Sequence, residues 1–357
     1  MTDYAALLTP NIVKSFPQET DYIYQPTPEP YAGEIDLNPD YELDDQLNRG
    51  TCVANACTSV IEDILKGVDE GESQSRLFND YVSRNVILEQ PGIEGSTIRA
   101  GIRGFKHYGS CREVTWPYDL TKFDVRPTDE AFAEAIEHVV QRYERIDNNL
   151  EFVPITPGMT EQQYRDAVFA ATKAKTLKAI DAALNEGLKV IMSCQLGRKW
   201  FGLTGPWQEH DYVFPSPDNS YVGNHAMVID GKSKQAGKYK LENSWKINGV
   251  WWGDGGYGGM DFDSFCNSLM EAFIIRGFDG IYVNDPFQVQ WDWIQKIYLG
   301  FYGRPADISG MLYWRDRLIK EGFGSIIEAF MTSAEAQVLY GEGKMKEANR
   351  ATRRNIY

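Results

Sequence analysis

Cys52 is the residue of this chain whose surroundings best suit nucleophilic chemistry. Gly50, two positions earlier, permits a sharp backbone turn. Apolar residues then recur at helical spacing from Val53 to Ile64. This pattern predicts a helix that begins at Cys52, where the helix dipole favours an anion. A thiolate is such an anion, so the position should lower the pKa of the thiol and make the sulfur nucleophilic. For a cysteine taken alone, a small buried core residue is the commoner interpretation, and two residues later in the chain decide against it here.

A nucleophilic thiol needs a base, and the base needs a group that orients it. His225 comes directly before the apolar run 226–229, which predicts a strand, and Asn243 ends the next predicted strand, 239–241. Two neighbouring antiparallel strands can bring the imidazole and the carboxamide together. The amide oxygen can then hold one ring nitrogen and leave the other for the sulfur. Taken alone, His225 would be interpreted as a buried structural histidine.

The sequence around the other histidines and around Asp261 and Asp263 gives weaker evidence for a catalytic or metal site. His107 is expected at a helix end and His138 within a charged helix, and His210 falls in a long loop. Asp261 and Asp263 resemble part of a calcium loop, but the ligand spacing is incomplete. We therefore expect neither a metal nor a cofactor.

The elements that must position these residues form two groups along the chain. The first group is helical, and its predicted members cover about 52–66, 74–87, 96–108 and most of 127–186. The second group consists of predicted strands at 188–192, 226–229 and 239–241. Helices followed by a sheet indicate an α+β fold with a cleft between the two halves.

The two ends of the chain differ from this middle part. Residues 25–30 carry proline at every second position, which predicts an extended arm along the surface. After about 284, short amphipathic patterns predict four small helices. The expected organisation is an N-terminal arm over 1–34, a catalytic domain over 35–283 and a helical domain over 284–357.

Composition restricts the partners. The net charge of −15 argues against nucleic acid and anionic membrane surfaces. The sequence has no apolar run of about 20 residues, the length of a membrane span, and its start lacks the features of a signal peptide. The five cysteines match neither zinc nor disulfide spacings, which indicates a reducing compartment. We expect synthesis in the cytoplasm, with packaging into a virion left open.

Four blocks of residues resemble the papain-like cysteine peptidases, including bacterial and viral members, and occur in the order of that family. The blocks are Gln46 with Cys52, 224–226, 243–245 and 252–257. The resemblance extends from about Ile35 to about Gly277. It implies a two-lobed fold, with a helical lobe and an antiparallel barrel-like lobe. It also implies hydrolysis of protein or peptide substrates through a thioester.

The resemblance implies a role for each matching residue. Cys52 would be the nucleophile, and His225 would form the thiolate–imidazolium pair and later protonate the leaving amine. Asn243 would orient His225, and Trp245 would shield their bond from water. The side chain of Gln46 and the backbone N–H of Cys52 would form the oxyanion hole.

The resemblance also implies that the backbone at Gly95 and Ser96 binds substrate as an added strand. The chain departs from the family pattern at three positions. Val53 replaces a usual tryptophan, Lys246 replaces a usual glycine, and Arg49 stands where many members have a disulfide cysteine. These departures affect substrate preference and regulation more than the chemistry.

The segment from about 289 to 341 resembles a small helical module found in bacterial surface proteins and phage proteins. It is interpreted either as an attachment module for a virion or cell-surface partner, or as a bundle that stabilises its neighbour. Three functions follow for the chain. It is an active peptidase with an attachment module, a virus structural protein with this fold and little activity, or an endopeptidase that acts on peptidoglycan.

Overall fold

The computed structural model describes residues 14–15, 23–24, 33–37, 43–66, 73–147, 153, 156, 158–278, 281–282, 294, 297–298, 313–314, 317, 321 and 323–333. The chain divides into two compact units. The first comprises Met1–Pro17 and Ile23–Asn284, and the second comprises Gln18–Tyr22 and Asp285–Tyr357. The division falls next to the expected start of the helical domain, whereas a separate N-terminal arm stays a prediction.

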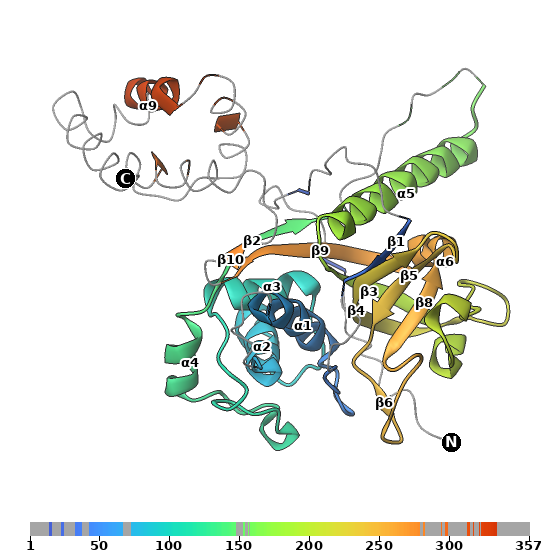
Figure 1. Cartoon of the computed structure of the whole chain (residues 1–357), viewed down its shortest axis with the longest axis horizontal. Helices are drawn as coiled ribbons and strands as arrows, with labels where there is room; N and C mark the ends of the chain where they lie inside the picture. Colours follow the sequence, from blue (N-terminus) through green and yellow to red (C-terminus); the bar gives the residue numbers. More distant parts are fainter. Residues whose placement is uncertain are drawn as a thin grey trace. The chain divides into compact units, whose positions relative to one another are not determined.

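Three helices of the first unit form one group (Figure 1). They are α1 (Cys52–Lys66), α2 (Arg76–Tyr81), which continues as a π-helix over Val82–Ile87, and α3 (Ile98–His107). Side chains cap two of them, because Ser75 accepts from the backbone N–H of Phe78 and Thr97 accepts from that of Ala100. These bounds agree with the three helices predicted before residue 110.

The strands of the first unit form one antiparallel sheet in the order β10-β9-β3-β4-β5-β8, with β1 added to β4 and β2 added to β9. The strands are β1 (Glu34–Asp36), β2 (Val140–Arg145), β3 (Val190–Gly197), β4 (Tyr221–Ser233), β5 (Lys238–Glu242), β8 (Tyr257–Asp261), β9 (Leu269–Phe278) and β10 (Ile281–Tyr282). Among the described residues the path from β10 to β8 is open, so the expected barrel-like lobe is an open sheet there. The hairpin β6 (Lys246–Ile247) and β7 (Val250–Trp251) is separate.

The sheet has helices on both faces because successive strand residues point to opposite sides. On one face, Ile191, Ala226 and Phe273 pack with residues of α1 and α3. On the other, neighbouring residues such as Met192 and Met227 pack with residues of α5. The helices and turns that complete this unit are α4 (Asp129–Ala135), α5 (Glu161–Asn185), α6 (Phe262–Ser268) and the 3-10 turns Leu120–Lys122, Arg198–Gly202 and Trp207–Glu209.

The expectation of a largely helical stretch over 127–186 is wrong in its middle. Strand β2 separates α4 from α5, and His138 lies in the turn before β2 rather than within a helix. Charged residues of β2 have tertiary partners, since Arg145 donates to the carbonyl of Ser15 and Glu144 accepts from Arg276. A strand whose charges are paired in the folded state does not show the apolar alternation that predicts strands.

The prolines of 25–30, from which a surface arm is predicted, lie outside the described residues, but Tyr24 just before them is buried. Its side chain is 4% exposed and belongs to the core cluster that includes Ala179 and Ile180. Its hydroxyl donates to Oε1 of Glu186 at 2.9 Å. Further along, Glu34–Asp36 forms strand β1, so the described parts of this segment are integrated with the first unit.

The second unit is described at a few helical positions and in α9 (Phe323–Thr332). The rings of Tyr298 and Trp314 lie 5.1 and 4.4 Å from that of Phe330, centroid to centroid. Helical residues thus occur in three of the four predicted helices, while the fourth, after Thr332, lies outside the described residues. None of the helices within the described ranges combines the length and apolar character that crossing a membrane requires.

Candidate active site

His225 and Asn243 meet at adjacent strands of the sheet. His225 lies in β4, Asn243 directly follows β5, and the two strands pair with Val228 opposite Glu242. The distance from Nε2 of His225 to Oδ1 of Asn243 is 2.7 Å. Because a carboxamide oxygen only accepts, Nε2 carries the proton and Nδ1 has the lone pair. Nδ1 has no hydrogen-bond partner in the described part of the chain.

The imidazole of His225 is enclosed by aromatic side chains. The Trp245 ring lies 4.2 Å from it, centroid to centroid, and Trp245 itself stacks on Phe201 at 5.3 Å. Burial lowers the pKa of His225 to about 4, and the hydrogen bond that His225 donates to Asn243 opposes this shift. Trp245 therefore stands where it can exclude water from the His225–Asn243 bond.

Cys52 is the first residue of α1 and is buried. It belongs to the same core cluster as Ala226, the residue that follows His225. It also contributes to a raised pKa of Cys194, mainly caused by burial, and Cys194 is paired with His225 across β3 and β4. The sequence-predicted nucleophile therefore packs against the strand region that bears the predicted base.

Gln46 is buried and held at both ends of its side chain. Its Nε2 donates to the carbonyl of Arg49 at 2.9 Å, and its Oε1 accepts from Oγ of Ser244 at 2.7 Å. Its backbone N–H donates to the carbonyl of Ser244 at 2.9 Å. A carboxamide has two N–H donors, so the bond to Arg49 leaves a second one. Ser244, which directly follows Asn243, thus links Gln46 to the segment that carries Asn243.

Tyr118 supports the same loop and was not predicted as a site residue. Its hydroxyl donates to the carbonyl of Gln46 at 2.8 Å and lies 2.5 Å from Oγ1 of Thr51. Asn55 adds a third tie, because its Nδ2 donates to Oγ1 of Thr51 at 3.1 Å. No pattern in the sequence around 116–119 indicates this partner.

Gly95 and Ser96, the expected substrate-binding residues, precede α3. Gly95 has φ +93°, a conformation that glycine adopts without strain. Ser96 is buried, and its hydroxyl donates to the carbonyl of Thr97. The preceding residue, Glu94, bonds to Arg49 and to the backbone of Gly50. The structure therefore brings this edge next to the loop that leads to Cys52.

The other polar residues singled out in the sequence have structural partners. His210 is buried, with Nδ1 accepting from the N–H of Gly259 and Nε2 at 3.0 Å from the carbonyl of Gly205. Asp261 caps α6 by accepting from the N–H groups of Asp263 and Ser264. No group of three His, Cys, Asp or Glu side chains suited to a metal occurs within the described residues.

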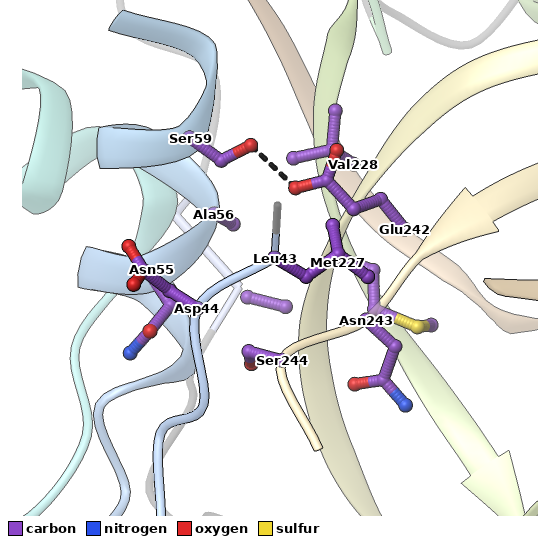
Figure 2. A pocket seen from close by; sticks show the side chains of 11 residues that line it. Leu43, Asp44, Asn55, Ala56, Ser59, Met227, Val228, Glu242, Asn243 and Ser244 are labelled. Carbon is purple, nitrogen blue, oxygen red and sulfur yellow. Dashed lines mark hydrogen bonds between the residues drawn. The ribbon is translucent and has the colours of Figure 1, made fainter. Parts of the chain in front are cut away.

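A small pocket with both polar and apolar lining lies between α1 and strands β4 and β5. Figure 2 shows Ser59 of α1 pointing toward Glu242 across it, and Asn243 and Ser244 also line it. Ser59 donates to Glu242 at this interface. The pocket borders Asn243 from the side of α1, so it belongs to the contact between helices and sheet that supports the site.

Comparison with solved structures establishes the fold. Xylellain, a cysteine protease from Xylella fastidiosa, is 20% identical with a TM-score of 0.59, covering 75% of this chain and 96% of that one. Digestive procathepsin L 3 of Tenebrio molitor is 16% identical with a TM-score of 0.53, covering 75% and 76%. ProCathepsin B S9 from Trypanosoma congolense is 16% identical with a TM-score of 0.51, covering 75% and 87%. The chain thus has the α+β fold of papain-like cysteine proteases.

One similar curated protein is an uncharacterized peptidase C1-like protein, L477, of Acanthamoeba polyphaga mimivirus. It is 26% identical over 226 residues, which are 61% of this chain and 63% of that protein. The chain therefore spans less than two thirds of the length of this relative. No known family model matches the chain.

Proposed function

We propose that this chain is a cysteine peptidase that hydrolyses peptide bonds through Cys52, His225 and Asn243. One observation carries the proposal. The Nε2 of His225 is bound to Asn243 while its Nδ1 lacks a partner among the described residues, on a strand packed against the helix that begins at Cys52. A base whose tautomer is set in this way is ready to take a proton from a thiol.

In the proposed mechanism, Nδ1 of His225 takes the proton of the Cys52 thiol. The thiolate, favoured by the N-terminus of α1, attacks the carbonyl carbon of the peptide bond. The oxygen becomes an oxyanion, which the side chain of Gln46 and the backbone N–H of Cys52 stabilise. When the C–N bond breaks, the imidazolium protonates the leaving amine and a thioester remains on Cys52.

The second half of the proposed cycle releases the acyl product. His225, neutral again, takes a proton from water as the water oxygen attacks the thioester carbonyl. The C–S bond then breaks, and the proton returns to the sulfur. Throughout, Asn243 holds Nε2 and Trp245 keeps water from that bond. The substrate binds in extended form beside Gly95 and Ser96.

The proposal extends to the setting of the enzyme. The relative in a giant virus supports an association with virus particles, in which residues 284–357 bind a virion or cell-surface partner. Two alternatives use the same fold. In one, the chain is a structural or attachment protein of a phage or virus with little activity. In the other, Cys52 and His225 cleave peptide bonds of peptidoglycan.

Mass-spectrometric mapping of cleavage products tests the proposal. Wild type and Cys52→Ala are incubated with denatured protein, short peptides and purified peptidoglycan. We expect new peptide termini that depend on Cys52 and persist in the control Cys266→Ala. Products from peptidoglycan alone would support the cell-wall alternative. The absence of Cys52-dependent products, together with thiol labelling of Cys52 no faster than that of Cys57, would support the structural alternative.

A further inference from the structure

Glu94 joins two segments that are distant in sequence. Its Oε1 lies 2.5 Å from Nη1 of Arg49, and its Oε2 accepts from the backbone N–H of Gly50 at 3.1 Å. Both oxygens of one carboxylate are therefore committed to one short loop. A carboxylate that binds a guanidinium and a backbone N–H makes charge-assisted bonds, which are stronger and more directional than neutral ones.

The loop held by Glu94 contains the proposed oxyanion donor. The carbonyl of Arg49 accepts from Nε2 of Gln46 at 2.9 Å and from the backbone N–H of Thr51 at 2.8 Å. Cys52 follows directly. The guanidinium of Arg49 also lies 4.9 Å from the centre of the Phe123 ring, which limits where its head group can be. A shift of Arg49 would therefore move the partner that orients Gln46.

The other segment held by Glu94 is the proposed substrate edge. Glu94 directly precedes Gly95 and Ser96, and residues 88–93 before it form no regular helix or strand. Glu89, Gly92 and Gly95 all have positive φ angles. The backbone bonds of this segment end at Ile93, whose N–H donates to the carbonyl of Gln90, so the position of Glu94 depends on its side chain. The carboxylate of Glu94 supplies this tie to the loop at Arg49 and Gly50.

The Arg49–Glu94 pair is too exposed to be mainly a stabilising ion pair. The side chain of Arg49 is 42% exposed and that of Glu94 is 37% exposed. Exposed ion pairs contribute little to folding stability and are screened by salt. The consequence of the pair is therefore expected in the relative position of the two segments it connects.

We infer that Arg49 and Glu94 are positioning residues that couple the oxyanion-forming loop to the substrate-binding edge. The inference rests on the proposed peptidase function and deepens it. Neither residue touches the reacting atoms. The pair holds Gln46 and Cys52 in register with Gly95, so that a peptide bound at the edge presents its carbonyl to the oxyanion donors. This arrangement makes turnover sensitive to ionic strength.

Charge reversal in the full-length chain tests the coupling. The single variants are Arg49→Glu and Glu94→Arg, the double variant carries both changes, and Arg165→Glu on the exposed part of α5 serves as a charge control. We expect each single variant to lose at least about tenfold in kcat/KM, since small misplacements of reacting groups are costly. The double variant should recover most of the loss, and melting temperatures should stay close to that of wild type.

The dependence of kcat/KM on salt concentration is a second readout, which would not change if the pair had a purely structural role. In wild type, kcat/KM should fall as NaCl rises from about 0.05 to 1 M. In Glu94→Gln, which keeps an acceptor for Gly50 but loses the charge, kcat/KM should be lower at low salt and nearly independent of salt. Single variants within twofold of wild type, or a double variant no better than the poorer single one, would overturn the coupling.

Hydrogen exchange tests the coupling without relying on activity. Arg49→Glu should speed exchange in residues 92–97, and Glu94→Ala should speed it in residues 47–52. In each case the affected segment is the one on the other side of the Arg49–Glu94 ion pair. Unchanged exchange in both segments would refute the inference, even if Cys52-dependent cleavage is found. If exchange changes but no Cys52-dependent cleavage is found, the coupling through Arg49 and Glu94 is supported and the peptidase function is refuted.

Discussion

Oδ1 of Asn243 lies 2.7 Å from Nε2 of His225, across two adjacent strands and 18 positions along the chain. This bond decides which ring nitrogen carries the proton, and thereby which nitrogen is left for the thiol. The site therefore depends on the pairing of β4 with β5 as much as on the residue types themselves.

Removal of the carboxamide should impair the base without removing it. In Asn243→Ala, the imidazole loses the bond that sets its orientation, and we expect kcat/KM to fall by about two- to tenfold, since one hydrogen bond contributes roughly 0.5–1.5 kcal/mol. Asn243→Asp keeps an acceptor and should retain more activity. Steady-state kinetics on one peptide substrate compare the two variants, with Asn267→Ala as control. Equal activity of the alanine variant and wild type would contradict the orienting role.

Burial of His225 should make stability depend on pH. Its pKa in the folded state is lowered to about 4, while the unfolded chain has a value near 6.5. Between these values the unfolded chain binds more protons, so the free energy of unfolding decreases as the pH falls from about 6.5 to about 4. The contribution of neutral His225 to the free energy of unfolding is fully present above a pH of about 6.5. It is lost as the pH falls through about 4.

Urea unfolding at pH 7 and pH 4.5 measures this loss. His225→Gln should lose less stability than wild type between the two pH values, by up to about 3 kcal/mol. The pKa of His210 is also lowered by burial, but that group is present in both proteins and cancels in the comparison. An equal loss in both proteins would show that His225 is not the group responsible.

Loss of the Gln46 carboxamide should slow turnover more than it weakens binding. An oxyanion develops only in the transition state, so a donor to it contributes to kcat rather than KM. We expect Gln46→Ala to lower kcat by about 10²–10³, the usual cost of one oxyanion donor. Gln235→Ala, at an exposed position, is the control. A tenfold rise in KM with kcat unchanged would assign Gln46 to substrate binding instead.

Trp245 should contribute to stability as well as to the site. It is fully buried between His225 and Phe201. Truncation in Trp245→Ala should cost about 3–5 kcal/mol of unfolding free energy, as for other large core residues. Trp245→Phe retains a ring and should cost less while leaving the imidazole more accessible to water. Guanidinium unfolding monitored by circular dichroism provides the comparison, and a loss under about 1 kcal/mol in the alanine variant would contradict the packing.

Ser15 should stabilise the first unit through a buried carboxylate. The backbone N–H of Ser15 donates to Oε2 of Glu271 at 3.2 Å, its hydroxyl also donates there, and the other oxygen of Glu271 accepts from the N–H of Ile98. In Ser15→Ala the buried oxygen loses a donor, which should cost about 1–3 kcal/mol. The exposed Ser73→Ala is the control for chemical denaturation. Identical midpoints for both variants would argue against this contact.

The sequence by itself determined the local elements of the site. The start of α1 at Cys52 was predictable because glycine before a helical apolar pattern is a local signal. The strand that carries His225 was predictable because its apolar run needs no distant partner to be recognised. The same reasoning missed β2, because Glu144 is paired with Arg276, 132 positions away, and Arg145 donates to the carbonyl of Ser15, 130 positions away.

Only the tertiary structure decided how these elements are joined. Ser244 meets Gln46 across 198 positions, Glu94 meets Arg49 across 45, and Ser15 meets Glu271 across 256. Each contact joins ordinary polar side chains whose sequence neighbours show no periodic pattern. The bonds of the buried Gln46 and Glu271 form because burial leaves a carboxamide or carboxylate without water, and the partner is whichever donor the packing places within reach. That placement is a property of the whole fold and has no local signature.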